Sequence, residues 1–262
     1  MSLRKEKYVE NHGIMNMGKD YHVYHMKWSD YLIACVIGFA AAAVVIHAFF
    51  NTLIFSVVCG ILCAAFAPKI MNAYRKEKTL YNLREQFKDL MDSLSGSYSA
   101  GKNTMKSFGD AGDDLKQIYG EKADIVNEVK IINTGLENGL TIEVMLLDFA
   151  ERCGLEDVKS FADVFDACNR EGGNIKEIVV MTRDVISEKI DVEIEIETII
   201  SGSKNELYIM MVMPVVIILI LNGLGSGTAN ENTLSNIVIK LVCIAIFAVA
   251  FLIGKKITDI KV

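Results

Sequence analysis

The sequence predicts an all-α membrane protein with four transmembrane helices, arranged as two hairpins, and a cytoplasmic antiparallel helical bundle. Two observations lead to this prediction. Of the 262 residues, 52% are hydrophobic and 23% are charged, and the apolar residues are concentrated in a few long runs. The segment between these runs, 69–206, contains no proline, and its apolar residues recur every three or four positions. This is the period of a helix that buries one face.

The first apolar run, 31–67, contains no Lys, Arg, Asp or Glu. As a single helix it would be roughly 55 Å long, nearly twice the hydrocarbon thickness of a bilayer, which is about 30 Å. The run must therefore fold back, and the polar pair Asn51-Thr52 is the best candidate for the turn. We predict spans over 31–50 and 53–68, the second closed by Pro68, so that residues 31–68 form the first hairpin.

The second hairpin is predicted over residues 207–254. Its two apolar stretches run from Leu207 to Leu221 and from Asn236 to Gly254. Pro214 is expected to kink the first of these spans. Lys240 lies close enough to one end of the second span to extend its ammonium group to the interface.

The basic residues predict the orientation. Five of the 27 Lys and Arg residues precede the first run, eighteen lie between the hairpins and three follow the last run, whereas both short connections contain none. By the positive-inside rule, both termini, the bundle (69–206) and the tail (255–262) are cytoplasmic. This predicts a multi-pass membrane protein.

Residues 1–30 are predicted to form a cytoplasmic segment that contains an interfacial helix. Tyr21, Tyr24, Trp28 and Tyr31 follow one another at helical offsets just before the first span. Aromatic side chains at such a position typically lie at the level of the lipid headgroups.

A short pattern occurs three times in the bundle, in SAGKNTMKSF (99–108), ENGLTIEVML (137–146) and EGGNIKEIVV (171–180). In each, a glycine ends one helical run and an Asn or Thr precedes the next. A left-handed glycine followed by an N-cap residue makes a tight turn between helices. We therefore expect antiparallel corners at Gly101, Gly139 and Gly173, with Asn174 as a cap. Gly172 is interpreted as an extra glycine that allows a close backbone approach.

IDVEIEIE (190–197) alternates like a strand, but no turn or partner strand is nearby. We interpret it as part of a long helix that runs through 174–206 and enters the membrane at Leu207.

Several sequence patterns resemble parts of catalytic or ligand-binding motifs, but none of these motifs is complete. GSYSAGKNT (96–104) approaches a phosphate-binding loop, but a helical pattern precedes it and Asn103 follows the lysine. The bundle contains no histidine, which removes histidine-based catalysis and His-ligated zinc from it. DAGDD (110–114) lacks calcium-loop spacing and is interpreted as a solvated turn.

The net charge of −6 argues against nucleic acid as a partner. We expect no enzyme activity, no metal and no cofactor.

The chain resembles a known family over about 83–221. LREQFKDLMDSLSGSYSAGKNTMKSF, then ENGLTIEVMLLDFAERCGLEDVKSFADVFDACNREGGNIKEIV, then a charged helix entering a span, are similar to the bacterial type II secretion system F domain. Within that family the chain looks most like the TadB/TadC-type platform proteins of tight-adherence (Flp) pilus machines. The most specific part of the resemblance is Glu171-Gly172-Gly173 followed by Asn174.

The resemblance implies an inner-membrane platform that couples a cytoplasmic secretion ATPase to the insertion of pilin subunits into a filament. The implied partners are that ATPase, prepilin, membrane lipid, and a second platform protein or a second copy. Two alternatives stay open: a membrane-anchored NTPase that uses residues 96–104, and a small four-span transporter or sensor. The residues expected to matter for structure or partner contact are Gly101, Gly139, Glu171, Gly172, Gly173, Asn174 and Pro214.

Overall fold

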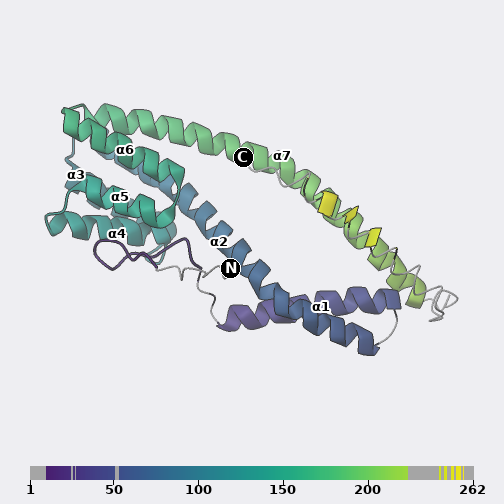
Figure 1. Cartoon of the computed structure of the whole chain (residues 1–262). Helices are drawn as coiled ribbons and strands as arrows, with labels where there is room; N and C mark the ends of the chain where they lie inside the picture. Colours follow the sequence, from purple (N-terminus) through teal and green to yellow (C-terminus); the bar gives the residue numbers. More distant parts are fainter. Residues whose placement is uncertain are drawn as a thin grey trace, which may run out of the picture. The chain divides into compact units, whose positions relative to one another are not determined.

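The computed structural model describes residues 10–24, 26, 28–50, 53–223 and single positions between 242 and 256. The described chain contains helices and no strand, so the all-α prediction is confirmed (Figure 1). The helices are α1 (Trp28–Phe50), α2 (Leu53–Ser99), α3 (Thr104–Tyr119), α4 (Asp124–Glu137), α5 (Ile142–Cys153), α6 (Glu156–Glu171) and α7 (Ile175–Gly223).

The chain divides into two compact units. The bundle unit comprises Met1–His25 and Ala73–Asp191, and the second unit comprises Met26–Asn72 and Val192–Val262. The helices α2 and α7 each contribute one part to each unit.

The core of the bundle unit is built from the apolar faces that the helical period predicts. The ring centroid of Phe87 in α2 lies 6.3 Å from that of Phe149 and 6.0 Å from that of Phe161. The ring centroids of Phe161 and Phe165 are 5.7 Å apart. These tilted and edge-on contacts are favourable beyond the burial of area alone. Other fully buried side chains are Leu83, Leu90, Met91, Leu94, Phe108, Leu115, Ile125 and Met145.

Successive helices of the bundle pack in pairs, α3 with α4, α4 with α5, and α5 with α6. Because the connections are short, neighbouring helices run antiparallel (Figure 1). The corners at 100–103, 138–141 and 172–174 therefore lie at one end of the bundle, which we call the distal end. The corners between α3 and α4 and between α5 and α6 lie at the opposite end.

Two helices are much longer than the others. α2 extends beyond its predicted boundary, and α7 is the long helix that the sequence predicts. α2 has 47 residues and continues through Pro68, so the helix does not end at the predicted boundary of the second span, while the end of the span itself stays a prediction. A proline removes one helical hydrogen bond, but the residues after it are good helix formers whose apolar face packs in the bundle. α7 covers 49 residues through 190–197 and Pro214, so the helical interpretation of the alternating stretch is confirmed.

Three described helices are long and apolar enough to cross a membrane, and the candidate ranges are Trp28–Ala48, Ser56–Ser99 and Ile175–Leu221. This supports a membrane protein. Most of the fourth predicted span, 236–254, lies outside the described residues. The four-span topology therefore stays a prediction.

The prediction of an interfacial helix near the N-terminus is wrong. Residues 10–24 form turns and irregular backbone, and α1 begins only at Trp28. Gly13 has φ +74° and Asn16 has φ +54°, values that interrupt a right-handed helix. Tyr21 is only 3% exposed and packs in the bundle unit rather than facing lipid headgroups. We call residues 10–24 the strap.

Candidate functional site

The distal end of the bundle is where the expected structural and partner-contact residues gather. Gly101 has φ +77° and Gly139 has φ +81°, the left-handed backbone that a glycine corner requires. Asn103 caps α3 through its side-chain oxygen, which accepts a 3.0 Å hydrogen bond from the backbone N–H of Lys106. Thr141 occupies the N-cap position of α5 without a side-chain hydrogen bond.

The two glycines of the third corner exchange the expected roles. Gly172, not Gly173, takes the left-handed conformation, with φ +70°, and ends α6. Gly173 instead makes the close approach, because a Cβ atom there would lie 2.8 Å from Sγ of Cys168. The backbone N–H of Gly173 donates to the carbonyl of Cys168 at 2.9 Å. The prediction for Gly173 was therefore wrong, since adjacent glycines cannot be told apart without the packing around them.

Side chains tie the three corners to one another. Nζ of Lys176 donates to the carbonyl of Ser99 at 3.1 Å, joining the third corner to the first. Nδ2 of Asn169 donates to Oε1 of Glu143 at 2.5 Å, joining α6 to α5. Glu171 and Asn174 are both exposed beside these contacts. The distal end thus presents a defined, polar surface, whereas Pro214 lies far along α7, in the other unit.

The near-match to a phosphate-binding loop has a different geometry from such a loop. Gly96 lies inside α2, and the helix continues to Ser99 before the corner. A phosphate-binding loop follows a strand and cradles phosphate with free backbone N–H groups. Nζ of Lys102 donates to Asp110, within α3. DAGDD (110–114) also lies inside α3, so its interpretation as a turn was wrong.

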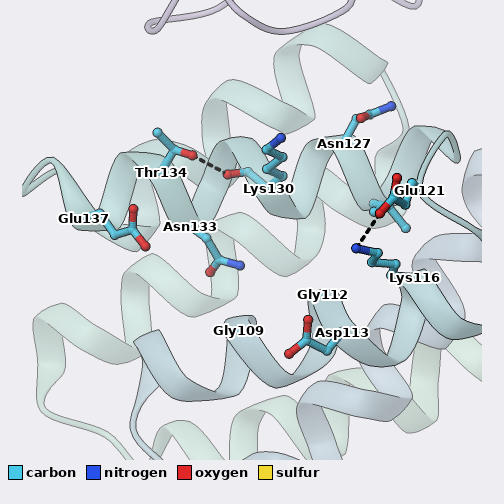
Figure 2. A pocket seen from close by; sticks show the side chains of 11 residues that line it. Gly109, Gly112, Asp113, Lys116, Glu121, Asn127, Lys130, Asn133, Thr134 and Glu137 are labelled. Carbon is cyan, nitrogen blue, oxygen red and sulfur yellow. Dashed lines mark hydrogen bonds and ion pairs between the residues drawn. The ribbon is translucent and has the colours of Figure 1, made fainter.

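A groove of about 510 Å³ lies between α3 and α4 (Figure 2). Gly109 and Gly112 of α3 leave room on one side, and charged side chains line the rim. Nζ of Lys116 meets a carboxylate oxygen of Glu121 at 2.6 Å, and this contact raises the pKa of Lys116 and lowers that of Glu121. Among the described residues, no group of three His, Cys, Asp or Glu is placed to hold a metal ion.

A buried charge cluster at the other end of the bundle was not predicted. Arg152 of α5 is fully buried, and its guanidinium donates to both carboxylate oxygens of Glu128 at 2.8 and 2.6 Å. Nε of Arg152 also donates to Asp148 at 2.9 Å. Burial by itself would lower the pKa of Arg152, but hydrogen bonds to Glu128 and Asp148 raise it above its usual value. This group stays charged.

The sequence does contain a signal for this cluster. Asp148 and Arg152 are four residues apart within LLDFAERC, and Glu128 falls between the core residues Ile125 and Ile132. A charged residue on the apolar face of a helix has to find a partner when the face is buried. The helical period therefore locates each member, but it does not show that they meet.

The chain was compared with protein-family models, curated proteins and solved structures. No family model, no curated protein and no solved structure matches this chain.

Proposed function

We propose that this chain is an inner-membrane platform protein of a type II secretion or Flp/Tad-type pilus assembly system. In this role it couples a cytoplasmic secretion ATPase to the insertion of pilin subunits into a filament. The observation that carries the proposal is that α2 and α7 are uninterrupted helices. Each has a membrane-length apolar segment at one end and a segment inside the bundle unit at the other.

We call residues 68–99 of α2 and 175–207 of α7, each of which lies only in part in the bundle unit, the two arms, and their lengths are similar. From Pro68 to Ser99 the arm of α2 rises about 46 Å, and from Ile175 to Leu207 the arm of α7 rises about 48 Å, at 1.5 Å per residue. Both end at distal-end corners, which Lys176 connects. In the proposed role, a force applied at the distal end passes along the continuous helices α2 and α7 to their apolar segments.

Charged side chains hold the two arms together. Nε of Arg183 in α7 donates to Asp92 of α2 at 2.5 Å, and Lys88 of α2 pairs with Asp191 of α7. These contacts are partly exposed, so each is worth little in stability. Their effect is to keep the arms in register, which suits two levers that move as one.

The proposed partners are those that the resemblance implies. The secretion ATPase would contact the bundle from the cytoplasm, while prepilin would contact the spans. A second platform protein or a second copy would complete the assembly. The orientation, with bundle and termini in the cytoplasm, comes from the distribution of basic residues.

The proposed transmission of force along α7 is tested by interrupting this helix. A four-residue Gly-Ser insertion between Gly202 and Ser203 adds flexibility between the bundle and the apolar segment. We expect it to abolish filament assembly in a complementation assay while the protein is still inserted at normal levels. The same insertion after Gly120, in the corner between α3 and α4, is the matched control and is expected to retain assembly. Normal assembly with the α7 insertion would refute the lever.

A further inference from the structure

The strap is held on the bundle by the buried charge cluster. The backbone N–H of Ile14 donates to Oδ1 of Asp148 at 2.8 Å, and the hydroxyl of Tyr21 donates to Oε1 of Glu128 at 2.9 Å. In return, the guanidinium of Arg152 donates to the carbonyl of Lys19 at 3.3 Å. The strap therefore bonds to all three members of the cluster.

Charge explains why the cluster needs the strap. One guanidinium faces two carboxylates, and all three side chains are at most 6% exposed. Buried carboxylates are costly unless their remaining lone pairs accept hydrogen bonds. The donors that supply them are the Tyr21 hydroxyl and the Ile14 N–H. Burial, together with the nearby charge of Glu128, raises the pKa of Tyr21, so its hydroxyl keeps the proton it donates.

The fit depends on glycines at two strap positions. A Cβ atom at Gly18 would lie 2.5 Å from the guanidinium carbon of Arg152, and one at Gly13 would lie 2.5 Å from Oδ2 of Asp148. Cβ atoms do not approach other atoms so closely, so a side chain at either position forces the strap or the side chains of the cluster to shift. On the bundle side, a Cβ atom at Gly154 would lie 2.8 Å from Nε2 of His22. This close backbone contact makes the docking specific.

The strap is nevertheless held mainly by polar contacts. Tyr21 is buried, but Ile14 is 58% exposed and Met17 is 60% exposed. The ion pair between Lys19 and Asp124, at 2.9 Å, is partly exposed. Segments that bury little apolar area open at low free energy. Water can also rehydrate a charge cluster, whereas an exposed apolar core would have no such compensation.

The strap also leads directly to a candidate span. Three residues separate Tyr24 from Trp28, the first residue of α1. Four Cα–Cα steps cover at most about 14 Å, so docking of the strap restricts where α1 can begin. We propose that the strap is a releasable latch: docked on the Arg152 cluster it ties the first span to the bundle, and it must detach while the protein works. The need for release rests on the proposed function, but the docking does not.

Docking is tested on the full chain in its membrane. The double variant Lys19→Cys/Asp124→Cys is treated with a short bis-maleimide, and the linked peptides are quantified by mass spectrometry after proteolysis. We expect a strong 19–124 cross-link within one chain. The pair Lys19→Cys/Glu137→Cys is the matched control, because position 137 lies about 20 Å further along α4 and should give no cross-link. A 19–124 link that joins two chains would overturn the latch.

Two strap variants test what holds the latch. Gly18→Ala should lower the 19–124 cross-link at least tenfold, and Tyr21→Phe, which removes only a hydroxyl, should lower it at least threefold. Gly109→Ala is the matched control, since a Cβ atom there meets nothing within 4 Å, and should leave the yield unchanged. Circular dichroism shows whether a variant still folds, and Tyr21→Phe serves if Gly18→Ala does not. An unchanged yield in a folded strap variant would overturn the proposal.

Release is tested by locking the latch. Filament assembly is compared in cells with the 19–124 pair cross-linked and with each single-cysteine variant treated in the same way. We expect the locked chain to lose assembly while the single variants keep it. Normal assembly by the locked chain would overturn the release step. The docking measurements do not involve filaments, so they stay informative if the proposed function fails.

Discussion

Replacing Arg152 by Met should destabilise the bundle unit strongly. The Met side chain keeps much of the apolar stem but removes the charge that faces Glu128 and Asp148, which are 1% and 6% exposed. Removing one member of a buried ion pair typically costs about 3–5 kcal/mol, because the remaining charge is left uncompensated. For a unit of roughly 140 residues, each kcal/mol lowers the melting temperature by about 3 °C. We therefore expect a fall of about 9–15 °C, measured by circular dichroism on the full chain in detergent.

Two further variants make this measurement decisive. Arg170→Met removes an arginine from an exposed pair with Asp166, also four residues apart, and should cost less than about 1 kcal/mol. Adding Glu128→Gln to Arg152→Met neutralises one orphaned carboxylate and should recover part of the loss. If Arg152→Met melts within about 3 °C of Arg170→Met, or if Glu128→Gln recovers nothing, the cluster does not stabilise the fold as argued.

Three other predictions concern single residues. Gly172→Ala should lower the free energy of unfolding by about 1–2 kcal/mol because of its left-handed backbone. Gly173→Ala should lower it by about 1–3 kcal/mol through overpacking against Cys168. In denaturation experiments, only the loss caused by Gly173→Ala should shrink when Cys168→Ala is added. Burial raises the pKa of the Cys153 thiol from 9.0 to about 11, so its thiolate at pH 8 is about 100-fold scarcer than in the unfolded chain. Alkylation by iodoacetamide should be slower by at least that factor, and an equal rate would contradict the burial. The stabilisation that comes with this raised pKa is complete below pH 9 and is lost as the pH rises towards 11. Lys102→Ala should leave ATP hydrolysis by the purified full chain at the same background level as the unaltered protein; hydrolysis that disappears in the variant would favour an NTPase.

Local features of the sequence determined the helical architecture. The apolar period of three and four, the missing prolines between 69 and 206 and the left-handed glycines at Gly101 and Gly139 each act within a few residues. The long apolar runs likewise predicted helices long enough to cross a membrane, and three such helices are found among the described residues. The alternating stretch 190–197 is helical, as predicted, because the neighbouring sequence offers no turn or partner strand.

Tertiary structure decided what the local patterns left open. The strap is held by bonds between residues 134 apart, Ile14 and Asp148, and 107 apart, Tyr21 and Glu128. No local pattern encodes such pairs, and the aromatic spacing near the N-terminus pointed to a helix that does not form. Likewise, only packing against Cys168 distinguishes Gly173 from Gly172, and only the packing of the α2 arm shows that the helix continues past Pro68. A helix depends on contacts four residues away, whereas a buried charge depends on whichever distant group the fold brings to it.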